Sequence, residues 1–207
     1  MRTPELIEQL TRDLEPVKPI SSLVNVLLWI LVSLISIFLI LVAMPVRDFS
    51  DFASNSMTPI FLLWFLFNSV ILARAANILG QPGRQHQRLI LWSGLAIYFL
   101  SAGVLFALSL YLNSPLIWNG GSCILGVGLL SAVPTIVFFV LIKKMAPTAP
   151  RLMGLILGLS AGSVGAFGIG FSCENSDPLH VLFFHLLIPA VLISGLSVIL
   201  AKKVFKW

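Results

Sequence analysis

From Leu89 to Ile142 the chain runs without a single charged residue. This stretch is too long for one membrane crossing, because about 20 apolar residues span the hydrocarbon core of a bilayer. A polar segment containing proline and glycine, residues 113–121, divides it into two. Only 10% of all residues are charged and 58% are hydrophobic, whereas soluble domains carry about 25% charged residues. Such a chain cannot cover a water-exposed surface, so the sequence predicts an integral membrane protein.

Similar uncharged runs occur before and after this stretch, and together they predict six transmembrane helices. The spans are expected at about residues 23–44, 59–79, 89–112, 122–142, 152–172 and 179–201. We therefore predict an all-α fold in which residues 21–207 form a six-helix transmembrane domain. Pro134 and Pro189 should kink the fourth and sixth spans, because proline removes a backbone hydrogen-bond donor and crowds the preceding turn.

The distribution of positive charge predicts the orientation of the spans. Eleven of the 13 Lys and Arg residues lie in the two terminal segments and in the loops 80–88 and 143–151. The alternate loops carry Asp48, Asp51, Glu174 and Asp177 and only one arginine, Arg47. Cytoplasmic loops of membrane proteins are enriched in Lys and Arg. Both termini are therefore expected in the cytoplasm, and a bacterial chain of this kind would lie in the inner membrane.

Residues 1–20 precede the first span and predict a short amphipathic helix. Thr3 can cap it, Pro4 suits its first position and Pro16 ends it. Its apolar residues recur every three or four positions and form one stripe. Up to Pro16, four acids accompany two arginines, whereas helices that lie on lipid are usually rich in Lys and Arg. Two interpretations are open: the helix rests on the membrane or on the bundle, or it docks a cytoplasmic partner. The residues that would make the docking contact are Glu5, Leu6, Ile7, Leu10, Asp13 and Leu14.

The fifth predicted span carries glycines four residues apart, at Gly154, Gly158 and Gly162. Small residues at this spacing let two helix backbones approach closely. We expect them to serve helix packing, within the bundle or between two copies, rather than a transport path.

The chain has two cysteines, and the predicted topology brings both to the outer surface. Cys123 lies at the outer start of the fourth span and Cys173 at the outer end of the fifth. Three interpretations are open. The pair forms a structural disulfide, because the periplasm is oxidising; it is a redox or metal sensor; or the two are unrelated buried thiols.

Two histidines follow Cys173. His180 begins the sixth span near the same surface, and two thiolates with an imidazole suit a soft or borderline ion such as Zn, Cd or Cu(I). Any such ion would bind transiently, and no cofactor is required. In a regular α-helix His185 would lie roughly 7–8 Å deeper and off the face that His180 occupies. We therefore expect His185 to be a hydrogen-bonded polar group inside the span. The alternative is that it binds a metal ion or supports a residue that does.

The sequence contains none of the motifs H-E-x-x-H, G-x-S-x-G or the P-loop. Arg74, near the end of the second span, is the only charged residue expected inside a span. These patterns argue against an enzyme or an ion pump. A signal relay, a small-solute or metal-ion transporter, and a structural membrane assembly factor remain as alternatives.

Several segments together resemble the NrsF-type membrane anti-sigma factors, a six-helix bacterial family. The first is Thr3–Val17, TPELIEQLTRDLEPV, which is similar to the family's opening pattern T-x-x-L-I-x-x-L-x-x-D-L-x-P-V. The others are Gly121–Cys123 (GSC), Ala146–Pro150 (APTAP), Cys173–His180 (CENSDPLH) and the basic C-terminus ending in Lys206–Trp207. The resemblance covers nearly the whole chain. Position 126, where some relatives carry a further cysteine, is Gly126 here.

The resemblance implies a negative regulator of transcription. Such proteins hold an extracytoplasmic-function (ECF) sigma factor at the cytoplasmic face, and their cysteine pair is implicated in the response to metal or oxidative stress. By this resemblance residues 1–18 would bind the sigma factor, and Cys123 and Cys173 would gate its release. The expected partners are an ECF sigma factor and membrane lipid, with no direct binding of nucleic acid.

Overall fold

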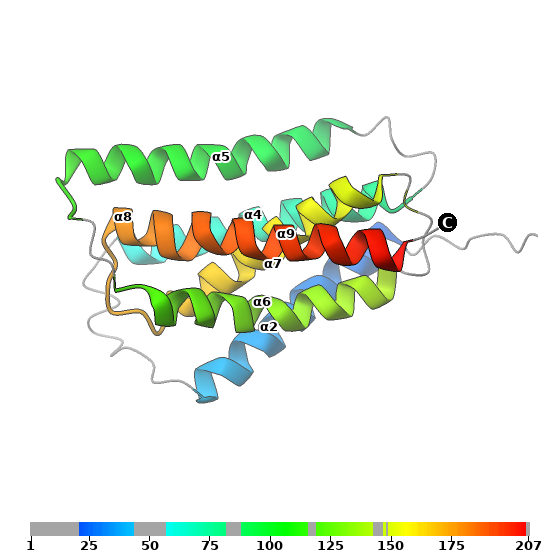
Figure 1. The fold of residues 1–207 in the computed structure, drawn as a ribbon, viewed down its shortest axis with the longest axis horizontal. Coiled ribbons are helices and arrows are strands. Elements are labelled where there is room, and N and C mark those ends of the chain that lie inside the picture. The colour runs from blue at the N-terminus through cyan, green and yellow to red at the C-terminus, as the bar shows by residue number, and fades with distance from the viewer. Residues whose placement is uncertain are drawn as a thin grey trace, which may run out of the picture.

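The computed structural model describes residues 21–43, 57–81, 88–115, 119–142, 147 and 149–205. This part of the chain contains helices and no strand, which confirms the all-α prediction for it. The predicted N-terminal helix, with Glu5, Leu6, Ile7, Leu10, Asp13 and Leu14, lies outside the described residues. The helices run roughly along one common axis (Figure 1) and are α2 (Ser22–Ala43), α4 (Met57–Leu79), α5 (Arg88–Tyr111), α6 (Gly121–Ile142), α7 (Pro150–Ile169), α8 (Pro178–His180), the π-helix η2 (Val181–Leu187) and α9 (Ile188–Val204).

The lengths of these helices suit a bilayer. Five described segments are long and apolar enough to cross one, namely Pro59–Leu79, Leu89–Tyr111, Gly121–Ile142, Pro150–Ile169 and Pro178–Val204. The last combines α8, η2 and α9 into one continuous helical rod. Helix α2 adds a shorter apolar stretch, Leu23–Leu39. This set of helices is consistent with a multi-pass membrane protein.

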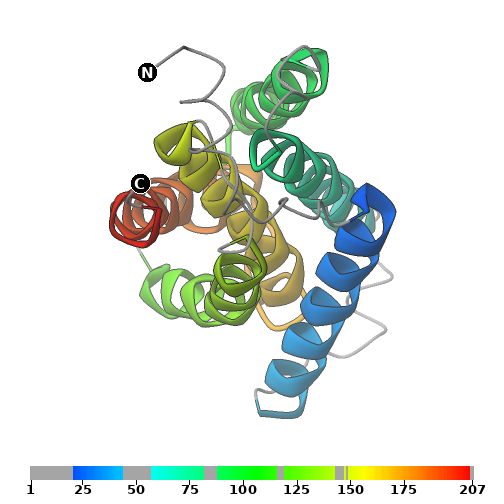
Figure 2. The same cartoon turned by 90° about the vertical axis from the view of Figure 1, so that its right-hand side faces the viewer.

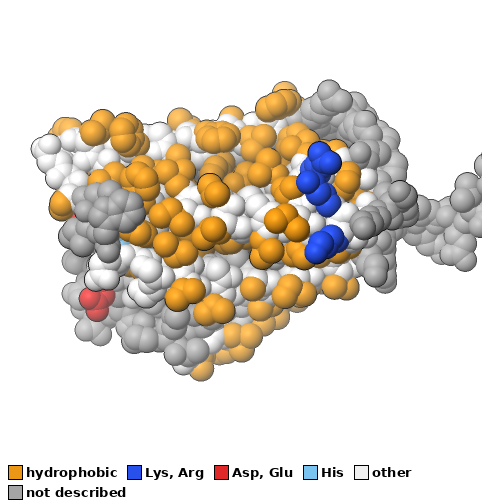
Figure 3. Space-filling view, in the orientation of Figure 1, with side chains coloured by type: hydrophobic (Ala, Val, Ile, Leu, Met, Phe, Trp, Pro, Cys, Tyr) orange, Lys and Arg blue, Asp and Glu red, His pale blue; other side chains and the backbone are white. Residues whose placement is uncertain are grey.

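The bundle is apolar outside and partly polar inside. Large hydrophobic side chains cover the outer face shown in Figure 3. Polar side chains lie between helices instead: Asn25 Nδ2 donates to Asn77 Oδ1 at 2.8 Å, and Trp29 Nε1 donates to Ser69 Oγ at 3.0 Å. Both hydrogen bonds join α2 to α4. An apolar exterior costs nothing in lipid, whereas polar groups there need partners within the protein.

Helix α7 lies at the centre of the bundle, as the end-on view in Figure 2 shows. It is packed against α9, α4, α6 and α2. Within an apolar stretch of 18 residues of α7, 83% of the residues are buried, against 28% in the corresponding stretch of α5 at the periphery. Helix α7 therefore has almost no surface left for lipid.

Glycines let the neighbours of α7 come this close. A Cβ on Gly154 would lie 2.7 Å from the backbone oxygen of Ser197, and one on Gly158 would lie 2.9 Å from the backbone nitrogen of Ser194. Both contacts are with α9. A Cβ on Gly162 would meet nothing nearer than 3.8 Å, so this glycine is not needed for close approach. Of the three glycines predicted to serve helix packing, Gly154 and Gly158 therefore allow the close approach of α9.

The two ends of the bundle differ in charge. Figure 3 shows Lys and Arg side chains at the end where α9 finishes and an acidic side chain at the opposite end. Lys202 and Lys203 occupy the last turn of α9, whereas Glu174 and Asp177 lie in the connection that leads into α8. We refer to these as the basic end and the acidic end.

Candidate metal or redox site

The connection between α7 and α8 turns Cys173 back onto the bundle. The N–H groups of Ser172 and Cys173 both donate to the carbonyl of Ile169, at 2.9 and 2.8 Å, which ends α7 in a tight turn. Beyond it, Asn175 Oδ1 accepts the N–H of Asp177 at 2.9 Å, and the Cys173 thiol contacts the Asn175 carbonyl at 3.5 Å. These local hydrogen bonds hold the Cys173 side chain, which is buried, in place at the acidic end.

Cys123 meets Cys173 from the first turn of α6. The sulfur atoms lie 3.2 Å apart, although 50 residues separate them in sequence. Both cysteines are buried thiols. The structure therefore brings together the pair that the predicted topology placed at one surface, and the two thiols are direct neighbours.

His180 and His185 both join this pair. His180 Nε2 lies 3.5 Å from Cys173 Sγ, and the two imidazole rings are 5.4 Å apart between centroids. The expectation that His185 lies off the face of His180 is wrong, because it assumed a regular α-helix, in which a separation of five residues turns a side chain by about 140°. Residues Val181–Leu187 form a π-helix, and its wider turn brings residues five apart onto one face.

A proline accounts for the wider turn. Pro189 is the second residue of α9, in the turn that follows η2. It has no N–H to donate, and its ring would crowd the carbonyl one α-helical turn earlier, that of His185. The Ile188 N–H bonds instead to the carbonyl of Phe183, five residues back. The predicted kink at Pro189 thus takes the form of a π-helical segment, a feature that often occurs at functional sites.

The resulting cluster consists of Cys123, Cys173, His180 and His185. One ligand atom of each, sulfur or imidazole nitrogen, lies within 4.8 Å of all the others. Both histidines are buried, with 2% and 3% of their surface exposed. His180 Nδ1 and His185 Nε2 make no hydrogen bond within the described residues. Buried polar nitrogens normally have a partner, so these two atoms need an explanation.

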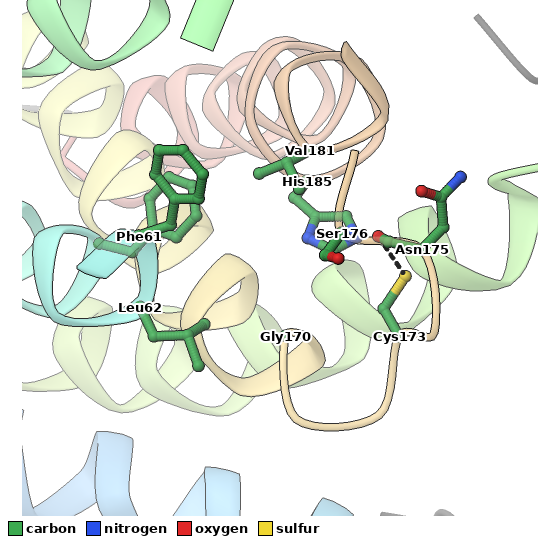
Figure 4. Close-up of a pocket in the computed structure, with 9 residues that line it drawn as sticks. Phe61, Leu62, Gly170, Cys173, Asn175, Ser176, Val181 and His185 are labelled. Atoms are coloured by element: carbon green, nitrogen blue, oxygen red, sulfur yellow. Dashed lines mark hydrogen bonds between the residues drawn. The ribbon is translucent and has the colours of Figure 1, made fainter. Parts of the chain in front are cut away.

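Two cavities reach the cluster. A cleft of about 370 Å³ is lined by Cys123, Cys173 and His180 together with Glu174 and other polar residues of the acidic end. A small pocket of about 20 Å³ touches Cys173 and His185 from the side of α4, where Phe61 and Leu62 line it (Figure 4). In that view His185 extends toward the connection that carries Cys173. The cleft on one side of the cluster is therefore larger and lined mainly by polar residues, whereas the pocket on the other side is small and has apolar residues of α4 in its lining.

Two supporting contacts were not predicted from the sequence. The Tyr98 hydroxyl, from α5, donates to the carbonyl of Leu186 in η2 at 3.2 Å. Gly120, just before α6, lies against the ring of Phe184, and a Cβ there would overlap that ring. Phe184 in turn packs on the ring of His180, with centroids 4.9 Å apart. No sequence pattern marks Tyr98 or Gly120 for such a role, because both contacts depend on where the π-helix lies.

Apolar helices and a buried thiol–imidazole cluster at one end define the class: a multi-pass helical membrane protein with a candidate metal or redox site. Comparison with protein families is more specific, because the family described as "NrsF: Negative regulator of sigma F" matches residues 10–207. The chain belongs to this family, which confirms the resemblance seen in its sequence. Comparisons with curated proteins and with solved structures found no match.

The family description makes the chain a negative regulator of a sigma factor, with a sigma factor as its partner. It describes a regulator rather than an enzyme. The matched range includes the predicted docking residues Leu10, Asp13 and Leu14 and begins after Glu5, Leu6 and Ile7.

Proposed function

We propose that this protein is an inner-membrane anti-sigma factor with six spans and both termini in the cytoplasm. It holds an ECF sigma factor through residues 1–18 and releases it when Cys123 and Cys173 react with a metal ion or an oxidant. The observation that carries the proposal is the 3.2 Å approach of the two sulfur atoms at the acidic end. Because the chain belongs to a family of negative sigma regulators, such a sensor would control the activity of a sigma factor.

The dimensions of α2 support its role as the first of the six spans. Its 22 residues, at 1.5 Å per residue, extend about 33 Å, and the hydrocarbon core of a bilayer is about 30 Å thick. The basic end of the bundle would face the cytoplasm, because Lys and Arg are enriched on that side. The cysteines would then face the periplasm, and the signal would cross the bundle from the acidic end to the basic end.

The N-terminal segment supports the docking role through its composition. Leu6, Leu10 and Leu14 recur on one helical face, and acids flank them. An apolar stripe of this kind can fill a hydrophobic groove on a partner. The acids would complement a basic, nucleic-acid-contacting surface of a sigma factor. A sigma factor covered in this way could not engage polymerase or DNA.

Two-hybrid assays of the full-length protein against the ECF sigma factors of its source bacterium test the docking role. Replacement of Leu6, Leu10 and Leu14 by Asp should abolish the interaction with the cognate sigma factor, because charge on the apolar stripe prevents its burial. Replacement of Gln9 and Thr11 by Ala, off the stripe, should leave binding unchanged. Equal binding by both variants, at equal membrane levels, would exclude this segment as the docking site.

A further inference from the structure

We propose that Cys123, Cys173, His180 and His185 form a four-ligand site for a zinc-like divalent cation, Zn²⁺ or Cd²⁺. The proposed function uses the two thiols as the reactive pair. The present inference adds both histidines as ligands and assigns a bound Zn²⁺ to the resting, reduced state, so that the metal ion that triggers release is one, such as Cd²⁺, that replaces it. Its physiological meaning rests on the proposed function, whereas the binding itself is a property of the purified protein.

The donor types select the ion. Two thiolates and two imidazoles form a standard structural ligand set for zinc, and nitrogen–sulfur sites of this kind disfavour Mg²⁺ and Ca²⁺, which prefer oxygen. Four protein ligands fill a tetrahedral shell, so the site is closed rather than catalytic. Cadmium is softer than zinc and would compete through the same two sulfurs.

The distances fit a tetrahedral site after small side-chain movements. With metal–sulfur bonds of about 2.3 Å and metal–nitrogen bonds of about 2.0–2.1 Å, a sulfur and a nitrogen lie about 3.6 Å apart and two sulfurs about 3.8 Å. The observed distance from Cys173 Sγ to His180 Nε2 is 3.5 Å. The sulfur atoms, at 3.2 Å, need to separate slightly. All four ligand atoms already lie within 4.8 Å of one another.

The π-helix is the element that completes the ligand set. It turns His185 toward the two sulfurs, a position that a regular α-helix would deny it. The ring is then buried, and Nε2 lacks a hydrogen-bond partner in the described residues. Coordination through His185 Nε2 would use a nitrogen lone pair that the described residues leave without a partner. His180 would bind through Nε2, which already lies beside Cys173 Sγ. The polar cleft on the side of Glu174 offers a path, since an exposed carboxylate at its lining attracts cations.

Metal binding and disulfide formation exclude each other at this site. A disulfide requires the sulfurs to approach to about 2.05 Å, whereas a shared tetrahedral ion holds them about 3.8 Å apart. The observed 3.2 Å lies between these two values. A bound ion should therefore protect the thiols from an oxidant, and oxidation should expel the ion. With diamide, the two thiols lose two electrons and two protons to the diazo group, which becomes a hydrazine as the S–S bond forms.

Titration of the reduced full-length protein in detergent micelles with Co²⁺ tests the site. One equivalent should give thiolate-to-cobalt charge-transfer absorption and the intense visible bands of tetrahedral Co²⁺, and Zn²⁺ should displace it. Cys123→Ser and Cys173→Ser should each weaken the charge-transfer band. His180→Ala and His185→Ala should lower Co²⁺ affinity more than about 100-fold, whereas His86→Ala, which replaces the remaining histidine, should bind as the wild type does.

A conservative replacement separates ligation from folding. His185→Cys keeps a metal ligand at this position and should restore tight binding with stronger charge-transfer absorption than the wild type. Saturating Zn²⁺ should slow the loss of titratable thiols to diamide at least tenfold in the wild type and not in His185→Ala. Wild-type affinity in both histidine-to-alanine variants, or no recovery in a folded His185→Cys protein, would overturn the inference. Neither result bears on sigma-factor binding, which the two-hybrid assay tests separately.

Discussion

At the scale of single residues, the geometry of the cluster depends on side chains that hold no reactive atom. Gly120 leaves room for the Phe184 ring, Phe184 packs on His180, and His180 lies against the Cys173 sulfur. Tyr98 adds a hydrogen bond to the backbone of the same π-helical segment. A chain of contacts therefore runs from a glycine that precedes α6 to the two thiols.

Replacement of Gly120 by Ala should destabilise the protein by about 1–3 kcal/mol, because the new methyl group overlaps the Phe184 ring and well-packed interiors resist added volume. Gly121→Ala is the matched control, since a Cβ there meets nothing within 4 Å, and its effect should stay within about 0.5 kcal/mol. Unfolding by SDS in mixed micelles measures both. Equal stability of the two variants would show that the Gly120 contact is unimportant.

At the scale of elements, α7 and the α8–η2–α9 rod form the frame of the site. Gly154 and Gly158 bring α7 against the backbone of α9. This contact fixes the distance between the connection that carries Cys173 and the helix that carries both histidines. The packing of two helices far from the thiols thus contributes to the position of the ligands.

Gly158, which takes part in this contact, and Gly162, which does not, should respond differently to substitution. Gly158→Ala should cost about 1–3 kcal/mol, because its methyl group would collide with the backbone of Ser194 and a helix backbone cannot yield locally. Gly162→Ala has space, and alanine is the better helix former by about 0.5–1 kcal/mol, so it should be neutral or stabilising. Thermal unfolding in detergent compares them. A loss of stability in Gly162→Ala as large as in Gly158→Ala would contradict the packing described above.

At the scale of the whole molecule, α8 and the end of α9 lie at opposite ends of the bundle, as Figure 1 shows. The cluster, which includes His180 of α8, is therefore remote from the basic end. In the proposed orientation the periplasm holds the signal and the cytoplasm holds the partner. A chemical change at the thiols must then alter the arrangement of helices to reach the sigma factor.

A reporter driven by a sigma-dependent promoter should reveal this link in cells. The variant with Cys123→Ser and Cys173→Ser should no longer respond to cadmium or diamide, because the reacting thiols are gone. Ser122→Ala and Ser172→Ala are adjacent controls that line the same cleft and should respond as the wild type does. A full response in the double cysteine variant, at equal protein level, would make the pair structural.

Hydropathy and charge were enough to predict the helices and the shared end of the two cysteines. The spans expected at 59–79 and 122–142 lie close to α4 and α6, because an uncharged run of bilayer length has few alternatives to a helix. The position of His185 could not be predicted in this way. Helical periodicity assumes 3.6 residues per turn, and the π-helix breaks that assumption at the residues that matter most.

The glycines of α7 illustrate the same limit. Their spacing predicted close packing along one face, but it did not show that the face is used only at Gly154 and Gly158. A second close contact lies further along, where a Cβ on Gly165 would meet Ser131 Oγ of α6 at 2.6 Å. Which partner each glycine meets depends on the crossing of three helices, and this is a tertiary property.

The burial of α7 has a consequence for how the regulator fails. A helix with a lipid-facing side accepts substitutions on that side, but α7 is surrounded by other helices and offers few tolerant positions. Because the protein is a negative regulator, lost folding means lost repression. Damage to α7 would therefore leave the sigma factor permanently released, whether or not a signal is present.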